Sequence, residues 1–188
     1  MKTIIPVKNG LEESFLRAYN KRMADAKVPP RFIQAIQKKE LVNFKAEESY
    51  YIHGKAGVGK TFLLCSLIKK LVTQNLLEYR RDKILYVSIP MLLHEIRATF
   101  HRESRLQSLD IINELVSYDY LFLDDIGSEK ISDWSTELIY SIIDYRYMEL
   151  KHFSLTSNIS LAELAKLTDE RISRRIEETC LIINKTRK

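Results

Sequence analysis

The sequence predicts an α/β domain in which a five-stranded parallel sheet carries helices on both of its faces. Three observations support this prediction. Short apolar runs alternate with longer helical runs from residue 49 to residue 184, which indicates strand–helix units and therefore parallel strands. A glycine-rich segment at residues 54–61 joins the first apolar run to a helical run. A later apolar run ends in two acids, Asp124 and Asp125, as expected where a buried strand reaches the carboxyl edge of a sheet.

Two helices are expected before the sheet begins. Residues 11–27 carry an apolar stripe at helical spacing, made of Phe15, Leu16, Tyr19 and Met23. The run Val28-Pro29-Pro30 should end this helix, because consecutive prolines cannot continue one. A second short helix is expected over residues 32–44. We therefore divide the chain into an N-terminal helical segment, residues 1–33, and a core, residues 34–188.

The core should consist of five strands and the helices that connect them. Apolar runs predict the strands at residues 49–53, 83–88, 120–124, 152–157 and 179–184. Amphipathic runs predict helices at residues 60–78, 91–100, 109–116 and 133–150, and one or two short helices within residues 161–176. Parallel strands joined in this way form one doubly wound domain.

Residues 54–61 match the phosphate-binding pattern G-x-x-x-x-G-K-[ST] in full. Glycines let the backbone turn tightly and bring N–H groups to phosphate oxygens, and the following helix points its positive end at them. Lys60 would reach the β- and γ-phosphates, and Thr61 would place its hydroxyl on Mg²⁺. The predicted ligand is ATP with Mg²⁺. Its predicted contacts are Gly54, Lys55, Ala56, Gly57, Val58, Gly59, Lys60, Thr61 and Phe62.

Two acids end the third predicted strand. Asp124 would hold Mg²⁺, directly or through water, and Asp125 would position and deprotonate the attacking water. The alternative for an Asp at such a place is a helix cap or a loop acid. The preceding phosphate-binding pattern favours the metal and catalytic interpretation.

Several short stretches occur in the order found in one family of AAA+ ATPases. They are Val28-Pro29-Pro30-Arg31-Phe32, residues 54–61, residues 89–100, Leu123-Asp124-Asp125-Ile126-Gly127, Trp134 with Ile143-Asp144-Tyr145-Arg146-Tyr147, Thr156-Ser157-Asn158, and Glu170-Arg171-Ile172-Ser173-Arg174-Arg175. This set, over residues 28–184, resembles the replicative helicase loaders of the DnaC/DnaI type and the related IstB transposition ATPases. The resemblance implies a P-loop AAA+ core of the ASCE class. It also implies ATP-bridged spirals that bind single-stranded DNA and open or place a ring helicase of the DnaB type.

The resemblance assigns further residues to the nucleotide site. Arg31 belongs to the stretch that lies near the adenine. Asn158 takes the place of the first sensor near the γ-phosphate, with a turn Asn at the strand end as the alternative. Asp125 stands where many AAA+ proteins carry the longer Glu, so slow hydrolysis is expected.

A basic segment, residues 169–176, is expected at the end of a helix. Arg171, Arg174 and Arg175 lie within about one turn of each other, and a solvated helix end that favours cations is one interpretation. The other is an arginine finger, which stabilises transition-state charge on the ATP of a neighbouring subunit and requires self-association. Arg175 matches the AAA+ pattern best, and Arg171 next. Arg146, on the preceding long helix, is most simply a core or interface residue, and a role facing a neighbouring subunit is the alternative.

The resemblance places the DNA contacts in the helices after the second strand. In this chain the region is residues 91–105, and its candidate contacts are Arg97, Phe100, His101, Arg102 and Arg105. Phe100 would stack on a base, and the cations would neutralise the DNA backbone without reading base sequence. The alternative is an amphipathic helix followed by an exposed basic loop.

The composition fits an ordinary globular protein of the cytoplasm. The net charge of +5 suits either a solvated surface or a polyanionic partner. Cys65 and Cys180 fit no metal-binding spacing and lie in apolar runs, so buried free thiols in a reducing cytoplasm are expected. The sequence shows neither a signal peptide nor an apolar run as long as a membrane span, so no membrane partner is expected.

Two features of the predicted chain organisation bear on function. The segment before Val28 is short, whereas loaders carry a longer N-terminal part that grips the helicase. No helical lid is expected after the last strand, which agrees with the loaders and differs from many other AAA+ proteins. Three functions are therefore carried forward: a helicase loader on single-stranded DNA, a transposition accessory ATPase on duplex DNA, and a slow ATP switch that contacts a replication protein.

Overall fold

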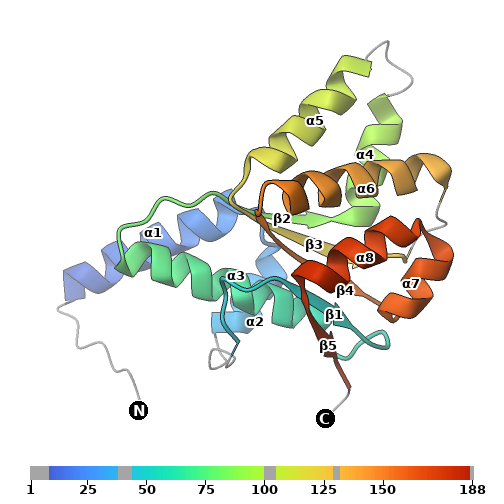
Figure 1. The fold of residues 1–188 in the computed structure, drawn as a ribbon. Helices are drawn as coiled ribbons and strands as arrows, with labels where there is room; N and C mark the ends of the chain where they lie inside the picture. The colour runs from blue at the N-terminus through green and yellow to red at the C-terminus, as the bar shows by residue number, and fades with distance from the viewer. Residues whose placement is uncertain (1–8, 38–43, 100–104, 129–131, 187–188) are drawn as a thin grey trace.

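Five parallel strands form a single sheet at the centre of the molecule (Figure 1). The computed structural model describes residues 9–37, 44–99, 105–128 and 132–186. The strands are β1 (Tyr50–His53), β2 (Ile84–Ser88), β3 (Tyr120–Ile126), β4 (His152–Ser157) and β5 (Leu181–Asn184), in the spatial order β2-β3-β4-β1-β5. The four pairings between these strands are parallel. The predicted α/β fold with a five-stranded parallel sheet is confirmed.

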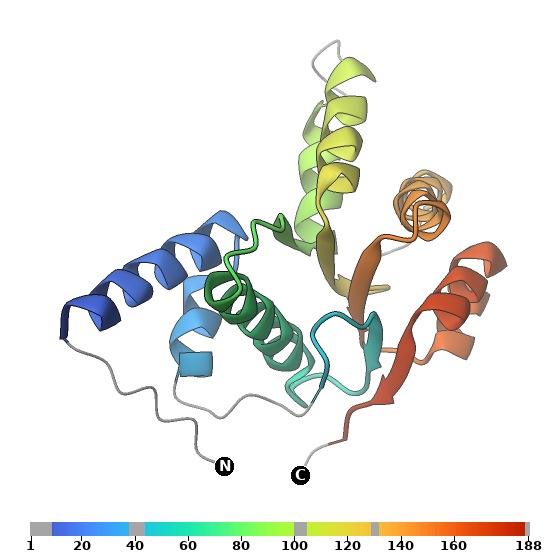
Figure 2. The same ribbon diagram turned by 60° about the vertical axis from the view of Figure 1, so that its left-hand side comes forward.

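Helices cover both faces of this sheet. On one face lie α1 (Asn9–Asp25), α2 (Pro30–Gln37) and α3 (Lys60–Leu77). On the other lie α4 (Ile89–Thr99), α5 (Arg105–Ser117), α6 (Asp133–Met148), α7 (Leu161–Leu167) and α8 (Glu170–Thr179). Helices α4 and α5 contact each other, and Figures 1 and 2 show them as a pair that stands away from the sheet.

The alternation of side chains along each strand divides the core into two clusters. In β3, Leu121 and Leu123 pack with α4, α6 and α8, whereas Phe122 between them packs with α3. In β1, Tyr51 belongs to the first cluster and Ile52 to the second. The sheet is therefore buried on both faces, which agrees with the continuous apolar runs of its strands.

Some element boundaries differ from the prediction. Helix α2 begins at Pro30, because proline suits the first turn of a helix, where its missing N–H needs no partner. The expected boundary between residues 33 and 34 falls within α2. The basic segment does not end a helix: Asp169 caps the N-terminus of α8 by accepting the N–H of Arg171, and the helix continues to Thr179. The prediction of a helix end at this segment was wrong.

A buried arginine joins several segments at the amino edge of the sheet. Arg146 of α6 is 0% exposed, so the interpretation of Arg146 as a core residue is confirmed and the alternative, that it faces a neighbouring subunit, is not. Its guanidinium donates to the backbone oxygens of His152 (2.6 and 2.8 Å), Asp119 (2.9 Å) and Leu115 (3.4 Å). Burial lowers the pKa of Arg146 to about 10. These carbonyls stabilise the buried cation and tie α5, α6 and β4 together.

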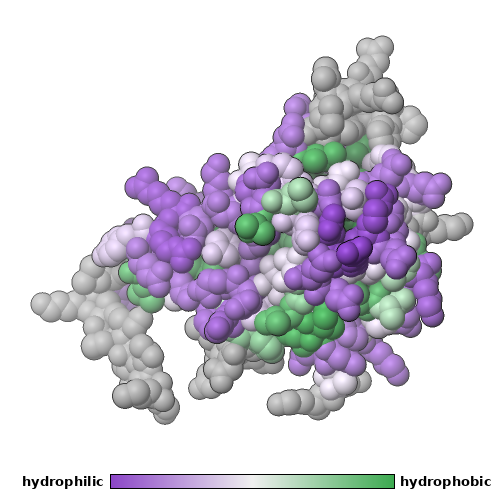
Figure 3. Space-filling model, viewed as in Figure 1, coloured by the Kyte–Doolittle hydropathy of each residue, from purple (hydrophilic) through white to green (hydrophobic). Residues whose placement is uncertain are grey.

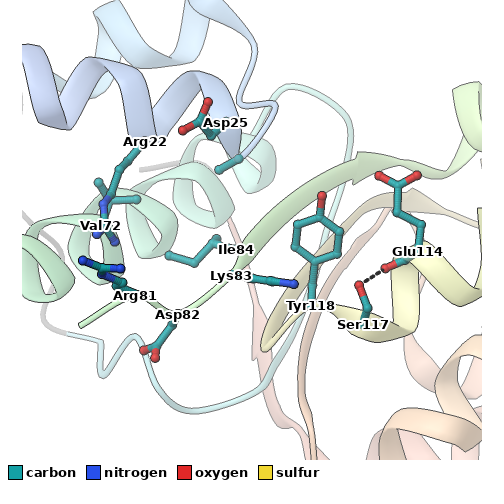
Figure 4. A pocket seen from close by; sticks show the side chains of 11 residues that line it. Arg22, Asp25, Val72, Arg81, Asp82, Lys83, Ile84, Glu114, Ser117 and Tyr118 are labelled. Atoms are coloured by element: carbon teal, nitrogen blue, oxygen red, sulfur yellow. Dashed lines mark hydrogen bonds between the residues drawn. The ribbon is translucent and has the colours of Figure 1, made fainter.

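A cavity of about 600 Å³ opens at the amino end of β2 (Figure 4). Its charged lining residues are equally divided between the two signs: Arg22, Arg81 and Lys83 against Asp25, Asp82 and Glu114. Residues 54–61 do not line it, because that loop follows the carboxyl end of β1. This cavity is therefore separate from the phosphate site that the sequence predicts.

The face seen in Figure 3 is mainly hydrophilic, with apolar side chains gathered over the β5 side of the sheet. On β5, Leu181 and Ile182 are 55% and 45% exposed. Cys65 and Cys180 are buried free thiols, as predicted, and burial raises the pKa of both. Among the helices of the described ranges, none is both long enough and apolar enough to cross a bilayer.

His152, the first residue of β4, should make stability depend on pH. Its ring lies 4.9 Å from that of Tyr120 and 5.0 Å from that of Phe122. Burial, with a smaller contribution from Arg146, lowers its pKa from 6.5 to about 4. Between these two values the unfolded chain binds a proton that the folded chain does not. The free energy of unfolding should therefore fall as the pH drops through this window, by on the order of 2–3 kcal/mol.

Urea unfolding of wild type and His152→Phe, from about pH 7 to about pH 4, checks this prediction. A phenyl ring keeps the aromatic contacts but cannot titrate, so the variant should lose less stability on acidification. The exposed His94 provides a control, since His94→Gln should follow the wild-type curve. Parallel curves for wild type and His152→Phe would contradict the prediction.

Candidate functional site

The glycine-rich loop leaves β1 at its carboxyl end and leads directly into α3. Gly59, with φ of 90°, is the N-cap of α3. Gly54 has φ of 148°, and a Cβ there would overlap the carbonyl oxygen of Lys185, so a side chain is excluded. The start of α3 leaves helix N–H groups unpaired beside this loop. The loop therefore has the conformation and the helix position that a bound phosphate requires.

Lys60 lies folded over this loop. Its side chain is buried, and Nζ donates to the backbone oxygens of Gly54 (2.8 Å) and Lys55 (3.1 Å) and to Oδ1 of Asn158 (2.7 Å). Burial lowers the pKa of the Lys60 ammonium, while Asp125 and, less strongly, Asp124 act in the opposite direction. The ammonium is thus fixed beside the loop where a phosphate chain would lie.

Asp124 is a buried carboxylate surrounded by hydroxyl groups. Its Oδ1 accepts from Oγ1 of Thr61 at 3.0 Å and from Oγ1 of Thr156 at 2.6 Å. Its Oδ2 accepts from the hydroxyl of Tyr86 at 2.7 Å. The residue is 7% exposed. Because all three donors are neutral, they orient the negative charge without cancelling it.

A β-bulge sets the position of Asp125. Between Leu123 and Ile126, β3 gains one residue relative to β4. Asp125 has φ of 66°, a left-handed conformation that Asp tolerates better than most residues. Its N–H donates to Oγ1 of Thr156 at 2.8 Å. One hydroxyl therefore donates to Asp124 and accepts from Asp125, which fixes the two acids relative to each other.

Asn158 connects the loop with the second acid. It follows β4 directly; its Oδ1 accepts from Lys60, and its Nδ2 donates to Oδ1 of Asp125 at 2.9 Å. Together with the contact between Thr61 and Asp124, this brings five predicted residues to one edge of the sheet. The Nδ2 donor of this amide can exchange the carboxylate for a phosphate oxygen or a water, and the Oδ1 acceptor can exchange the ammonium for a water.

Sequence reasoning missed Thr156 and Tyr86. Thr156 belongs to the polar end of β4, but nothing in its spacing says that its hydroxyl bridges two acids. Tyr86 stands in an otherwise apolar stretch of β2, and a lone phenol there was the available signal. Burial, followed by the charge of Asp124, raises the pKa of Tyr86, so its hydroxyl remains a donor at neutral pH.

The residues fit an Mg²⁺ whose coordination is completed by phosphate and water. Over the described ranges, no group of three or more His, Cys, Asp or Glu side chains could hold a metal by itself. Mg²⁺ in nucleotide sites uses one or two protein oxygens and fills its other positions with phosphate oxygens and waters. The carboxylate of Asp124 and the hydroxyl of Thr61 are such oxygens and are already in contact. Mg²⁺ binding here should therefore require nucleotide.

A cavity of about 450 Å³ adjoins the loop and has mainly apolar walls. It is lined by Phe44, Val58, Gly59, Phe62, Leu63, Ile183 and Lys185. Apolar walls beside a phosphate loop suit a planar base. Phe62 was predicted as a nucleotide contact and lies in this wall. Phe44 and Ile183 were not predicted as contacts, because only the fold brings them to the loop. Arg31 was predicted to lie near the adenine, but it is exposed on α2 and does not line the cavity.

The two candidate finger arginines lie on α8 and contact other residues. Nε of Arg175 donates to Oδ1 of Asp144 at 3.0 Å, and its guanidinium lies 4.1 Å from the ring centroid of Tyr147. The guanidinium of Arg171 lies 4.1 Å from the ring centroid of Tyr140. Neither arginine bonds to residues 54–61 of its own chain within the described structure. A role for either one in a neighbouring subunit stays a prediction.

The predicted DNA contacts are only partly described. Arg97 is exposed on α4, with its guanidinium 5.5 Å from the ring centroid of Trp134. Arg105 is the first residue of α5. Phe100, His101 and Arg102 lie outside the described residues. The pair α4–α5 that borders this stretch stands away from the sheet (Figure 2).

Comparison with known proteins identifies the family. The family of IstB-like ATP binding proteins matches residues 13–181. The chain is 26% identical over 128 residues to the replicative helicase loader DnaC of Escherichia coli (strain K12). This alignment covers 68% of this chain and 49% of DnaC. It is 30% identical over 115 residues to the replicative helicase loader DnaI of Bacillus subtilis (strain 168). That alignment covers 61% of this chain and 34% of DnaI. The chain thus spans about half or less of the length of these curated relatives.

Solved structures agree with the fold. The crystal structure of the DnaC helicase loader matches with a TM-score of 0.63 at 26% identity, covering 83% of this chain and 86% of that one. The replication initiator DnaA bound to AMPPCP and single-stranded DNA matches with a TM-score of 0.63 at 17% identity, covering 84% of this chain and 44% of DnaA, a likeness of fold alone. The chain belongs to the family of IstB-like ATP binding proteins, and the predicted resemblance to DnaC and DnaI is confirmed.

Replacing Thr156 with valine, a side chain of similar shape, should destabilise the protein. The change leaves the N–H of Asp125 without its acceptor and removes a donor from Asp124. An unsatisfied buried polar group costs about 1–3 kcal/mol, so the free energy of unfolding from urea titration should fall by about that amount. Thr73→Val is the control, because the hydroxyl of Thr73 donates to the Lys69 carbonyl within α3 and bridges no pair of acids among the described residues. Equal effects of the two substitutions would refute the bridging role.

Proposed function

We propose that this member of the IstB-like ATP binding protein family is an ATP-dependent DNA replication protein. It binds single-stranded DNA as an ATP-bridged oligomer and loads or remodels a ring helicase of the DnaB type. The observation that carries the proposal is the connected set Lys60–Asn158–Asp125 beside Thr61 and Asp124. The names of DnaC and DnaI as helicase loaders support the assignment to replication.

Each residue of the site has a role in this proposal. The loop N–H groups and Lys60 hold the phosphates, and Thr61 and Asp124 hold Mg²⁺, which when bound supplies charge neutralisation at the phosphate oxygens. The Nδ2 group of Asn158, which donates to Asp125, turns to donate to the γ-phosphate. Asp125 accepts a proton from the attacking water. The short side chain of Asp125 favours slow hydrolysis, so the bound ATP acts mainly as an assembly signal.

Self-association completes the site in this proposal. Arg175, with Arg171 as the second candidate, reaches the ATP of the neighbouring subunit. The Asp144 carboxylate and the Tyr147 ring hold the Arg175 guanidinium in one direction, which lowers the entropy lost when it meets a phosphate.

DNA binding is assigned to the end of the α4–α5 pair. Arg97, Arg105 and residues 100–102 between them supply cations and one aromatic ring, the side chains that a single strand needs for backbone neutralisation and base stacking. Such binding should weaken strongly with added salt. The protein acts in the cytoplasm, where buried free thiols such as Cys65 stay reduced.

ATP should strengthen the binding of this chain to single-stranded DNA. In fluorescence anisotropy with labelled oligonucleotides, the chain should bind single strands more tightly with ATP and Mg²⁺ than with ADP. Lys60→Ala should lose this difference, because its loop cannot hold the phosphates, while Lys69→Ala on the same helix should retain it. We expect an affinity difference of about tenfold or more between ATP and ADP, a coupling free energy of at least about 1.4 kcal/mol.

Two outcomes would redirect the assignment. An ATP-dependent preference for duplex DNA would favour the transposition accessory ATPase, which the match to IstB-like proteins makes the second candidate. Absence of DNA binding in every nucleotide state would contradict both and leave an ATP switch that binds a replication protein.

Arg175 should act as an arginine finger on the ATP of a neighbouring subunit. Lys60→Ala keeps Arg175 but loses the phosphate loop, and Arg175→Ala keeps the loop but loses the finger. Each variant alone should hydrolyse ATP about a hundredfold more slowly than wild type or worse, whereas a mixture should recover measurable turnover. Arg174→Ala, which removes the neighbouring arginine bonded to Glu178, should hydrolyse ATP normally. A mixture as inactive as its components would exclude Arg175 as a finger in trans.

A further inference from the structure

Tyr86 of β2 reaches Asp124 on the neighbouring strand β3. Tyr86 of β2 lies opposite Phe122 of β3, and Asp124 is two residues further along β3. Residues two apart on a strand share a face, and such diagonal neighbours lie about 7–8 Å apart, within reach of a long aromatic side chain. The phenol oxygen accordingly donates to Oδ2 of Asp124 at 2.7 Å.

The hydroxyl of Tyr86 bonds to the carboxylate oxygen of Asp124 that the two threonines do not contact. Thr61 and Thr156 both donate to Oδ1, and Tyr86 donates to Oδ2. Without the phenol, Oδ2 has no hydrogen-bond donor among the described residues. Asp124 would then keep donors on one oxygen only and could rotate about its side-chain bonds. Groups that hold a metal ligand from behind in this way typically change metal affinity by about 10–100-fold when removed.

The backbone of Tyr86 is held as firmly as its side chain. Strand β2 lies at one edge of the sheet, where strand N–H groups lack a neighbouring strand. The N–H of Tyr86 instead donates to the carbonyl of Ala26, in the segment between α1 and α2, at 2.8 Å. Tyr86 is 8% exposed and packs in the cluster beneath α3. The packing of the ring, the backbone hydrogen bond and the hydroxyl hydrogen bond thus all hold the phenol in one position.

We propose that Tyr86 is a positioning residue for the nucleotide-bound Mg²⁺, acting by orienting the carboxylate of Asp124. It does not touch the metal or the nucleotide. The proposal rests on the proposed binding of ATP and Mg²⁺ at residues 54–61 and Asp124, and it adds a residue from β2, which carries none of the motif residues. Binding of ATP without metal depends on the loop and Lys60, so the phenol should leave it unchanged.

The test measures binding of a fluorescent ATP analogue to the full chain, first in EDTA and then during titration with Mg²⁺. Tyr86→Phe keeps the ring and removes only the hydroxyl. It should bind the analogue in EDTA within about twofold of wild type and should need about tenfold more Mg²⁺ for half of the metal-dependent change. Tyr120→Phe is the matched control, because it removes a phenol near the opposite end of β3, and it should need the same Mg²⁺ concentration as wild type.

A double-mutant cycle separates positioning from general damage. In an Asp124→Asn background, where the carboxylate is absent, Tyr86→Phe should cause no further change in the Mg²⁺ requirement. An unchanged Mg²⁺ requirement in Tyr86→Phe would overturn the proposal. An equal loss of affinity in EDTA and in Mg²⁺, or an undiminished effect in the Asp124→Asn background, would also overturn it. Failure of wild type to bind the analogue at all would instead remove the ATP site on which the proposed function depends.

Discussion

The arrangement of the site depends on the hydrogen bonds that hold the buried, negatively charged carboxylate of Asp124. Burying an ionised carboxylate is costly unless hydrogen bonds replace the lost water. Its three donors come from different elements: Thr61 from α3, Tyr86 from β2 and Thr156 from β4. One side chain of β3 is therefore hydrogen-bonded to both neighbouring strands and to the helix above them. The phosphate loop is placed through the same contact, because Thr61 belongs to the first turn of α3.

The parallel sheet and the central residues of the site could be predicted from sequence because each follows a local rule. The phosphate loop is a contiguous pattern, and Asp124 follows directly on the continuous apolar run of β3. The contributions of Tyr86 and Thr156 could not be predicted in this way. They depend on strand order and register, which place β2 and β4 on either side of β3. The bulge at Asp125 is a further example, because the extra residue is defined only by comparison with β4.

The helix that carries the finger candidates shows a different limit of sequence reasoning. The run Arg171–Arg175 resembles a basic helix end, yet Asp169 before it is the stronger signal, an N-cap acid that starts a new helix. The aromatic partners of these arginines, Tyr140 and Tyr147, lie on α6, about thirty residues earlier in the chain. Contacts between helices that are distant in sequence leave no spacing pattern, so only the packing of α8 against α6 reveals them.

The backbone hydrogen bond between Ala26 and Tyr86 limits how such a chain can diversify. An edge strand with open N–H groups invites pairing with foreign strands, and the segment after α1 occupies one of these positions on β2. Met23 and Val28, on either side of Ala26, are buried in the same core as α3. Recombination within this segment would open the sheet edge next to the residue that orients Asp124. New binding modules can therefore be acquired by fusion ahead of the buried part of α1, but not by exchanging it.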